Sequence, residues 1–139
     1  MMSAVVLDTS VLVAGLLSRH GAASTLVNAY FADRLPLAYT PDILREYGEV
    51  LARPEFAAAI TATDRLAILM KLRASGLRVE PARVPAVAWP DADDIPFVAA
   101  ALATERKIVI TLNPRDFAPA SALGVRVLSP AEARRVLLL

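Results

Sequence analysis

The sequence of 139 residues contains no cysteine and only one histidine. The first absence excludes a disulfide framework and thiolate metal sites, and together the two argue against zinc. The charges are nearly balanced, with fifteen basic residues, fourteen acidic residues and a net charge of +1. Such a chain lacks the strongly basic surface of proteins that hold nucleic acid mainly by bulk electrostatics. Any function must therefore be inferred from where the charged residues lie.

Long uninterrupted apolar runs are also missing, although 56% of the residues are hydrophobic and the mean hydropathy is +0.49. Asp8 interrupts the first such run, well short of the roughly 20 apolar residues that a membrane span requires. The N-terminus has neither the basic segment nor the small-residue cleavage site of a signal peptide. We therefore expect a cytoplasmic protein that does not enter a membrane.

Short β-branched segments alternate along the chain with longer segments of helical spacing. The predicted strands are 4–7, 36–40, 77–80, 107–111 and 125–128, and the predicted helices are 10–17, 22–31, 41–53, 55–60, 64–75, 94–104 and one from Pro130. This alternation predicts a single α/β domain over 1–139, a three-layer α/β/α sandwich with a mostly parallel central sheet. Ligands of such sheets bind beyond the carboxyl ends of the strands, near a switch in strand order.

Two aspartates are predicted at this edge of the sheet. Asp8 directly follows the first strand, and Asp116 lies in the turn after the strand 107–111. Each also has a purely structural interpretation: Asp8 as the cap of the helix that follows, and Asp116 as an ordinary turn residue.

The helix that begins at Pro41 carries two glutamates with different predicted environments. Its apolar stripe consists of Ile43, Leu44, Tyr47, Val50 and Leu51. At about 100° per residue, Glu46 lies at the edge of this stripe and Glu49 lies almost opposite its centre. A carboxylate at the boundary of a buried face is costly without a partner, so Glu46 is a candidate ligand, although a snorkelling surface glutamate fits the same position.

Three acids, Asp91, Asp93 and Asp94, precede an apolar helix whose first turn contains Pro96. Capping and the helix dipole both favour aspartate there, but one cap needs only one aspartate. Adjacent carboxylates entering a buried helix repel one another unless a cation lies among them. Asp94 would point along the face packed against the sheet.

Considered together, Asp8, Glu46, Asp94 and Asp116 come from four separate segments, three of them predicted near one edge of the sheet. Carboxylate oxygens are the ligands that Mg²⁺ or Mn²⁺ prefers. A carboxylate cup for such an ion is the simplest explanation of the pattern.

The ordered set of motifs resembles the PIN domain family, and within it the bacterial VapC-type toxins. The resemblance runs from end to end through "VVLDTSVLVAGLL", "TPDILREYGEVLARPEF", "DADDIPFVAAALA", "VITLNPRDF" and "GVRVLSP". It implies an α/β/α fold and a metal-dependent ribonuclease, the toxin of a toxin–antitoxin pair. It also implies a homodimer and a small antitoxin partner whose segment covers the cleft.

The resemblance also assigns site residues. It places catalytic metal ligands at Asp8, Glu46, Asp94 and Asp116, an additional ligand at Asp91, and supporting polar groups at Thr9, Ser10, Thr111 and Asn113. Many PIN domains have an aspartate where this chain has Asn113, and the acid here comes three residues later, at Asp116. Basic residues that flank these segments are candidates for contact with the RNA backbone, although each is more often simply solvated: Arg45, Arg53, Lys107 and Arg115.

Two other classes of protein compete with the nuclease. One is a catalytically silent module that keeps the fold and binds RNA or a partner, although such modules usually lose one of the four acids. The other is a phosphotransfer domain of the haloacid-dehalogenase or receiver type, which also uses an aspartate at a strand end. "LDTSV" lacks the second aspartate that the first type needs, and no acidic pair with a separate phosphoacceptor is evident for the second.

Overall fold

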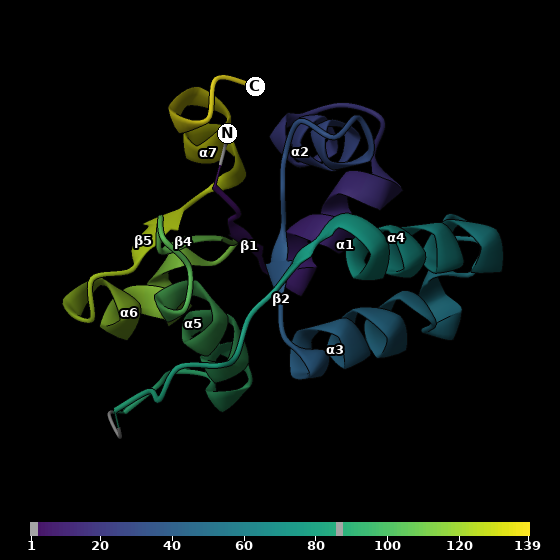
Figure 1. Cartoon of the computed structure of the whole chain (residues 1–139). Coiled ribbons are helices and arrows are strands. Elements are labelled where there is room, and N and C mark those ends of the chain that lie inside the picture. The colour runs from purple at the N-terminus through teal and green to yellow at the C-terminus, as the bar shows by residue number, and fades with distance from the viewer. Residues whose placement is uncertain (1–2, 86–87) are drawn as a thin grey trace.

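The computed structural model describes residues 3–85 and 88–139, and Figure 1 shows helices on both sides of a small sheet. The strands are β1 (Val6–Leu7), β2 (Ala38–Tyr39), β3 (Leu77–Arg78), β4 (Ile108–Ile110) and β5 (Arg126–Leu128). The α-helices are α1 (Thr9–Leu17), α2 (Ala22–Phe31), α3 (Pro41–Leu51), α4 (Ala62–Ser75), α5 (Ile95–Leu102), α6 (Ala118–Ala122) and α7 (Pro130–Val136). The described residues also form the 3₁₀ helices η1 (Pro54–Phe56), η2 (Ala92–Asp94) and η3 (Pro114–Phe117).

All strand pairs are parallel. β4 lies between β1 and β5, and β2 pairs with β3. A bridge between Val5 and Leu37 joins the two groups, which gives the spatial order β3-β2-β1-β4-β5. The chain thus moves outward from β1 in one direction through β2 and β3, and then returns to the other side of β1 with β4 and β5. The switch in strand order lies between β1 and β4, where open α/β sheets bind their ligands.

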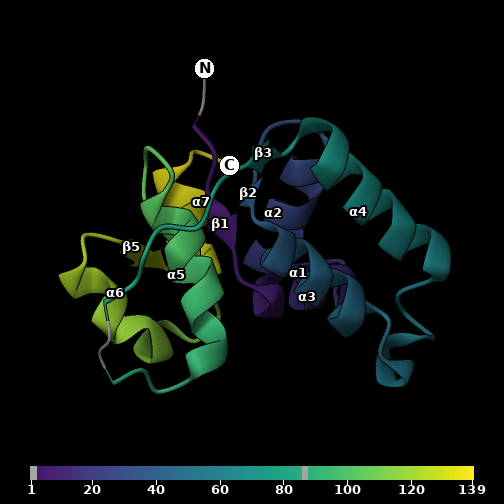
Figure 2. The same ribbon diagram turned by 60° about the horizontal axis from the view of Figure 1, so that its bottom comes forward.

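Helices cover both faces of the sheet. α5 packs against β1, β2 and β4, with α3 beside it, whereas α2 and α7 contact each other on the opposite face (Figure 1). After rotation of the view, α6 still lies beyond β5 at one end of the molecule, and α4 lies at the other end (Figure 2). The three-layer α/β/α sandwich predicted from the sequence is therefore confirmed.

A buried tyrosine fixes α3 against the sheet. Tyr47 is 1% exposed, and its hydroxyl donates a hydrogen bond to the carbonyl oxygen of Leu7 at the end of β1. Its ring lies 6.5 Å, centroid to centroid, from the ring of Phe97 in α5. Because Tyr47 holds this turn of α3, the neighbouring Glu46 side chain is held near the carboxyl end of β1.

The pair α1 and α2 is strongly apolar and closely packed. A Cβ atom on Gly15 would lie 2.6 Å from the carbonyl oxygen of Ala23, so the two backbones approach as closely as only glycine permits. Within residues 3–85 and 88–139, no single helix is long and apolar enough to cross a membrane. α1 and α2 reach that length and apolar content only together, and they are bent by 95° at their junction.

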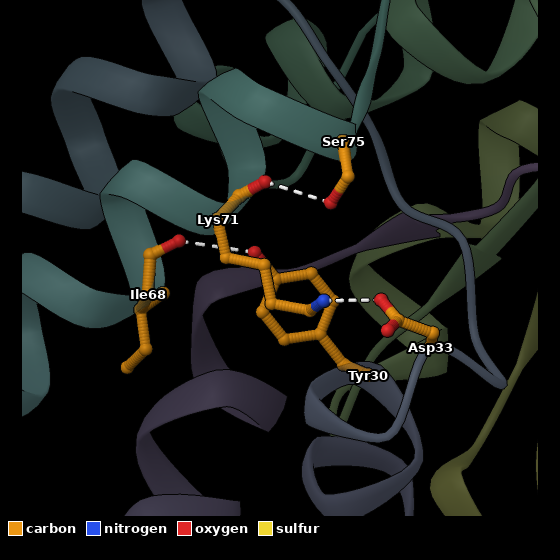
Figure 3. Close-up of polar contacts among 5 residues, drawn as sticks. All are labelled: Tyr30, Asp33, Ile68, Lys71 and Ser75. Atoms are coloured by element: carbon orange, nitrogen blue, oxygen red, sulfur yellow. Dashed lines mark hydrogen bonds and ion pairs between the residues drawn. The ribbon is translucent and has the colours of Figure 1, made fainter.

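Polar contacts attach α4 to α2 (Figure 3). The Tyr30 hydroxyl donates a 3.0 Å hydrogen bond to the carbonyl oxygen of Ile68, and the Lys71 amine pairs with the Asp33 carboxylate. Lys71 Nζ also lies 5.6 Å from the Tyr30 ring centroid, and burial raises the pKa of Tyr30. A cavity of about 150 Å³ adjoins this cluster. Since these polar groups already have partners, the cluster is explained by helix packing.

Two segments differ from the prediction. The segment 55–60 was expected to be helical, but only the 3₁₀ turn η1 forms there. The segment 113–117 was expected to be a simple turn, but it forms η3 and runs directly into α6. Both differences involve elements of one or two turns, which are too short to show a helical period in sequence.

Candidate active site

Side chains from separate segments meet at the carboxyl edge of the sheet. Asp8 follows β1, Thr111 follows β4, and α5 begins at this edge because its chain then runs back to the start of β4. Here the structure forms a cleft of about 330 Å³, lined by Asp8, Thr9, Ser10, Val13, Glu46, Val50, Arg53, Phe56, Asp91, Asp93, Asp94 and Phe97. Thus the cleft lies at the switch in strand order and contains most of the predicted acids.

Asp8 is 8% exposed and is held by hydroxyl groups. Its Oδ2 accepts hydrogen bonds of 2.8 Å from Ser10 Oγ and 2.7 Å from Thr111 Oγ1. Although Asp8 occupies the N-cap position of α1, its side chain makes no capping hydrogen bond. The capping interpretation is therefore wrong for this residue. Burial raises the pKa of Asp8, and the two hydroxyl donors oppose that rise.

The same hydroxyls are themselves positioned by backbone amides. Ser10 Oγ accepts a 3.3 Å hydrogen bond from the amide of Leu112, and Thr111 Oγ1 accepts one of 3.1 Å from the amide of Asn113. Asn113 itself is exposed, so its contribution here is its backbone amide. These contacts connect the start of α1 to the segment after β4.

Glu46 extends from α3 into the cleft and accepts a hydrogen bond from Thr9 Oγ1. It is half-buried, whereas Glu49 is exposed, so the predicted placement of the two glutamates on α3 is confirmed. Burial raises the pKa of Glu46, the Thr9 hydrogen bond opposes this, and the charges of Asp8 and Asp93 add to it. Repulsion from its acidic neighbours thus disfavours the ionised form of Glu46.

The acids that precede α5 divide into two kinds. Asp91 caps η2, where its Oδ1 accepts a 2.9 Å hydrogen bond from the amide of Asp93. Asp94 occupies the N-cap position of α5 without a side-chain capping bond. Burial, followed by the charges of Asp8, Asp91, Asp116 and Glu46, raises the pKa of Asp94 to about 7. The charges of acids from the other three segments therefore all disfavour ionisation of Asp94.

Asp116 lies in η3, half-buried and outside the residues that line the cleft. Its charge nevertheless reaches the site, since it contributes to the raised pKa of Asp94. The structure therefore brings Asp8, Glu46 and Asp94 together in the cleft and places Asp116 at its margin.

Comparison with known proteins identifies the family. A family model described as PIN domain matches residues 4–115, which is most of the chain and includes every acid of the cleft. The chain belongs to the PIN domain family. No curated protein matches it. PIN domains are generally nucleases and typically use divalent metal ions.

The donor chemistry of this PIN domain suits such an ion. The cleft presents carboxylate and hydroxyl oxygens, which hard divalent cations prefer. Within the described residues, however, no group of three or more acidic or histidine side chains is already arranged to hold a metal ion. The hydroxyl groups orient Asp8 and Glu46 through one carboxylate oxygen each, Oδ2 of Asp8 and Oε2 of Glu46. Small side-chain adjustments would have to accompany binding of an ion, and the mutual repulsion at Asp94 favours a cation that neutralises it.

The predicted basic residues occupy different positions around the PIN domain. Arg53 lines the cleft, and its charge opposes the raised pKa of Glu46. Arg45 is exposed and pairs with Asp42 at 2.9 Å, and Arg115 is exposed in η3. Lys107 precedes β4, at the opposite end of that strand from Thr111. Its position therefore gives no support to an RNA contact beside the acids.

Asp93 and the apolar residues of the cleft were not predicted to belong to the site. Val13 follows Thr9 by one turn of α1, and Val50 follows Glu46 by one turn of α3. The i, i+4 spacing from each predicted polar residue was the available signal. This spacing alone does not indicate a binding site, because valines at helical spacing are usually core residues.

Proposed function

We propose that this PIN domain is a metal-dependent endoribonuclease that hydrolyses RNA phosphodiester bonds. The observation that supports it most is the cleft at the switch in strand order, where Asp8, Glu46 and Asp94 come together from three separate segments. A structural acid cluster would be costly here, because adjacent carboxylates repel one another without a compensating cation. In a family of nucleases, the simplest explanation of such a cleft is that its acids bind the metal ion needed for phosphodiester hydrolysis.

The residues would act through position and charge. Asp8 and Asp94 would hold Mg²⁺ or Mn²⁺, with Glu46 and Asp116 as further ligands or as groups that orient the attacking water. When bound, such an ion lowers the pKa of water, shields the phosphate and stabilises the leaving oxygen. Thr9, Ser10 and Thr111 keep the carboxylates oriented by hydrogen bonds, which is how surrounding groups commonly tune a metal site.

The resemblance to VapC-type proteins supports a more specific role. In this proposal the chain is the toxin of a toxin–antitoxin pair in the cytoplasm. It acts as a homodimer, and a small antitoxin covers the cleft. The test is to express the chain alone, to look for growth arrest, and to ask whether a short open reading frame, where one adjoins its gene, relieves that arrest on co-expression. Growth unaffected by the chain alone would contradict the toxin role while leaving nuclease activity open to direct assay.

Direct assay separates the nuclease from a silent binding module. Purified protein should cleave single-stranded or loop RNA in Mg²⁺ or Mn²⁺ and should be inactive in EDTA. Undiminished cleavage in the chelator would exclude the metal mechanism. Binding of RNA without cleavage in either ion would favour the silent module.

A further inference from the structure

The cleft has an apolar half beyond its carboxylates. Thr9 of α1 and Glu46 of α3 are joined by a hydrogen bond, and Val13 and Val50 follow them on the same faces of their helices. Each valine lies one helical turn, about 5.4 Å, beyond its polar neighbour. Phe56 of η1 completes this wall. The cleft therefore changes from acidic to apolar over the length of one helical turn.

The apolar half is open to a ligand. Val13, Val50 and Phe56 are each only half-buried, whereas Phe97, which also lines the cleft, is 1% exposed and belongs to the core. The whole cleft, at about 330 Å³, is near the lower limit of pockets that hold small organic ligands, about 300–1,000 Å³. Such a space suits a single nucleotide unit and is too small for a base pair.

A planar cation lies beside this wall. Arg53 follows the end of α3, lines the same cleft and is exposed to solvent. A guanidinium group stacks on nucleobases and also pairs with phosphates, so it suits either part of a nucleotide. An acidic peptide would meet the carboxylates unfavourably, and an aliphatic ligand would make no use of the cation.

We infer that the apolar half of the cleft, formed by Val13, Val50 and Phe56 with Arg53 beside it, binds the base of an unpaired nucleotide whose phosphate a divalent ion would hold at the carboxylates. This inference rests on the proposed function and names the residues that bind the base. A base in a duplex is stacked and paired, so its faces are not available to Phe56. Stacking on an aromatic ring is available to every base, so the site selects unpaired RNA more than it selects sequence.

The test measures binding apart from cleavage. Fluorescence anisotropy would follow a labelled single-stranded oligoribonucleotide in Ca²⁺, with gel analysis to show that the RNA stays intact. Phe56→Ala should weaken binding by about fivefold or more, the lower end of what loss of base stacking produces. Phe56→Leu should weaken binding similarly, although it preserves apolar packing. Phe56→Trp keeps an aromatic ring and should bind RNA about as well as the wild type. Thermal melts would verify that each variant is folded.

The matched control is Phe31→Ala, because Phe31 is 41% exposed on α2 and is not among the residues that line the cleft. It should bind as the wild type does, and a duplex of the same sequence should bind the wild type more weakly. Binding by Phe56→Leu equal to the wild type, or no RNA binding by the wild type, would overturn the inference. Cleavage that is independent of Phe56 would remove the base site and leave the nuclease. Binding that depends on Phe56, without cleavage in Mg²⁺ or Mn²⁺, would support the base site and contradict the nuclease.

Discussion

Thr111 donates a buried hydrogen bond of 2.7 Å to Oδ2 of Asp8, although 103 positions separate the two residues in the chain. Thr111 follows β4 and Asp8 follows β1, so the bond links the two strand ends on either side of the switch in strand order. It orients the most buried carboxylate of the site and lowers its pKa against the effect of burial.

Loss of this hydroxyl should impair the site. Thr111→Val keeps the shape of the side chain but removes the donor, so the pKa of Asp8 should rise further and the carboxylate should lose its orientation. A hydrogen bond to a charged group contributes about 1.5–3 kcal/mol, which corresponds to a loss of cleavage of roughly tenfold or more. Thr111→Ser retains a hydroxyl and should recover most of the rate. Equal rates for wild type and Thr111→Val would show that this bond does not orient Asp8 for the reaction.

The two glutamates of α3 provide a matched pair. Glu46→Gln should reduce RNA cleavage at least about tenfold, equivalent to about 1.4 kcal/mol of barrier, because its carboxylate lies in the cleft. Glu49→Gln should leave the rate nearly unchanged, since that side chain is exposed. The measurement is a cleavage time course on one substrate with both variants. Similar losses in both would mean that the effect comes from general changes in α3.

Removing one acid should help the metal-free protein. Asp94→Asn removes the carboxylate on which the other charges converge, so its melting temperature in EDTA should equal or exceed that of the wild type. The same variant should lose cleavage and also the stabilisation that Mn²⁺ gives the wild type, about 2.7 kcal/mol at a hundred times the dissociation constant. An unchanged Mn²⁺ shift in the variant would remove Asp94 from the metal site.

The stability of the metal-free protein should depend on pH through the same residue. The pKa of Asp94 is about 7 in the folded chain against 3.8 for an unperturbed aspartate, so between these values the folded state binds more protons than the unfolded state. The contribution of Asp94 to stability is therefore greatest below about pH 4 and is lost as the pH rises toward 7. Melts in EDTA from pH 5 to pH 8 should show a steeper decline for wild type than for Asp94→Asn. Parallel declines would place the titrating group elsewhere.

Several features were predictable because they depend on local periodicity. The apolar stripe of α3 separated Glu46 from Glu49 by angle alone, and the structure has Glu46 half-buried and Glu49 exposed. The alternation of strand and helix predicted the layered sheet, because a parallel strand needs a helical crossover to reach its neighbour.

Other features could not be predicted because they depend on contacts between distant segments. Asp8 and Asp94 both stand at the N-cap positions of helices, where sequence favours a capping role, yet neither side chain caps its helix. The hydroxyl of Thr111, which follows β4, binds the Asp8 carboxylate instead, and burial together with the charges of other carboxylates raises the pKa of Asp94. Lys107 is close in sequence to Thr111 and was expected to flank the site. The two residues lie at opposite ends of β4, so Lys107 is at the other edge of the sheet.

The sequence by itself determined the layers and the helix faces, since these follow from residue type and from spacings of a few positions. Only the tertiary structure decided which acids face one another and that Val13, Val50 and Phe56 form a wall beside them. The physical reason is that the strand order β3-β2-β1-β4-β5 brings β1 beside β4. That pairing is stabilised by apolar burial summed over the whole core, so no local motif encodes it.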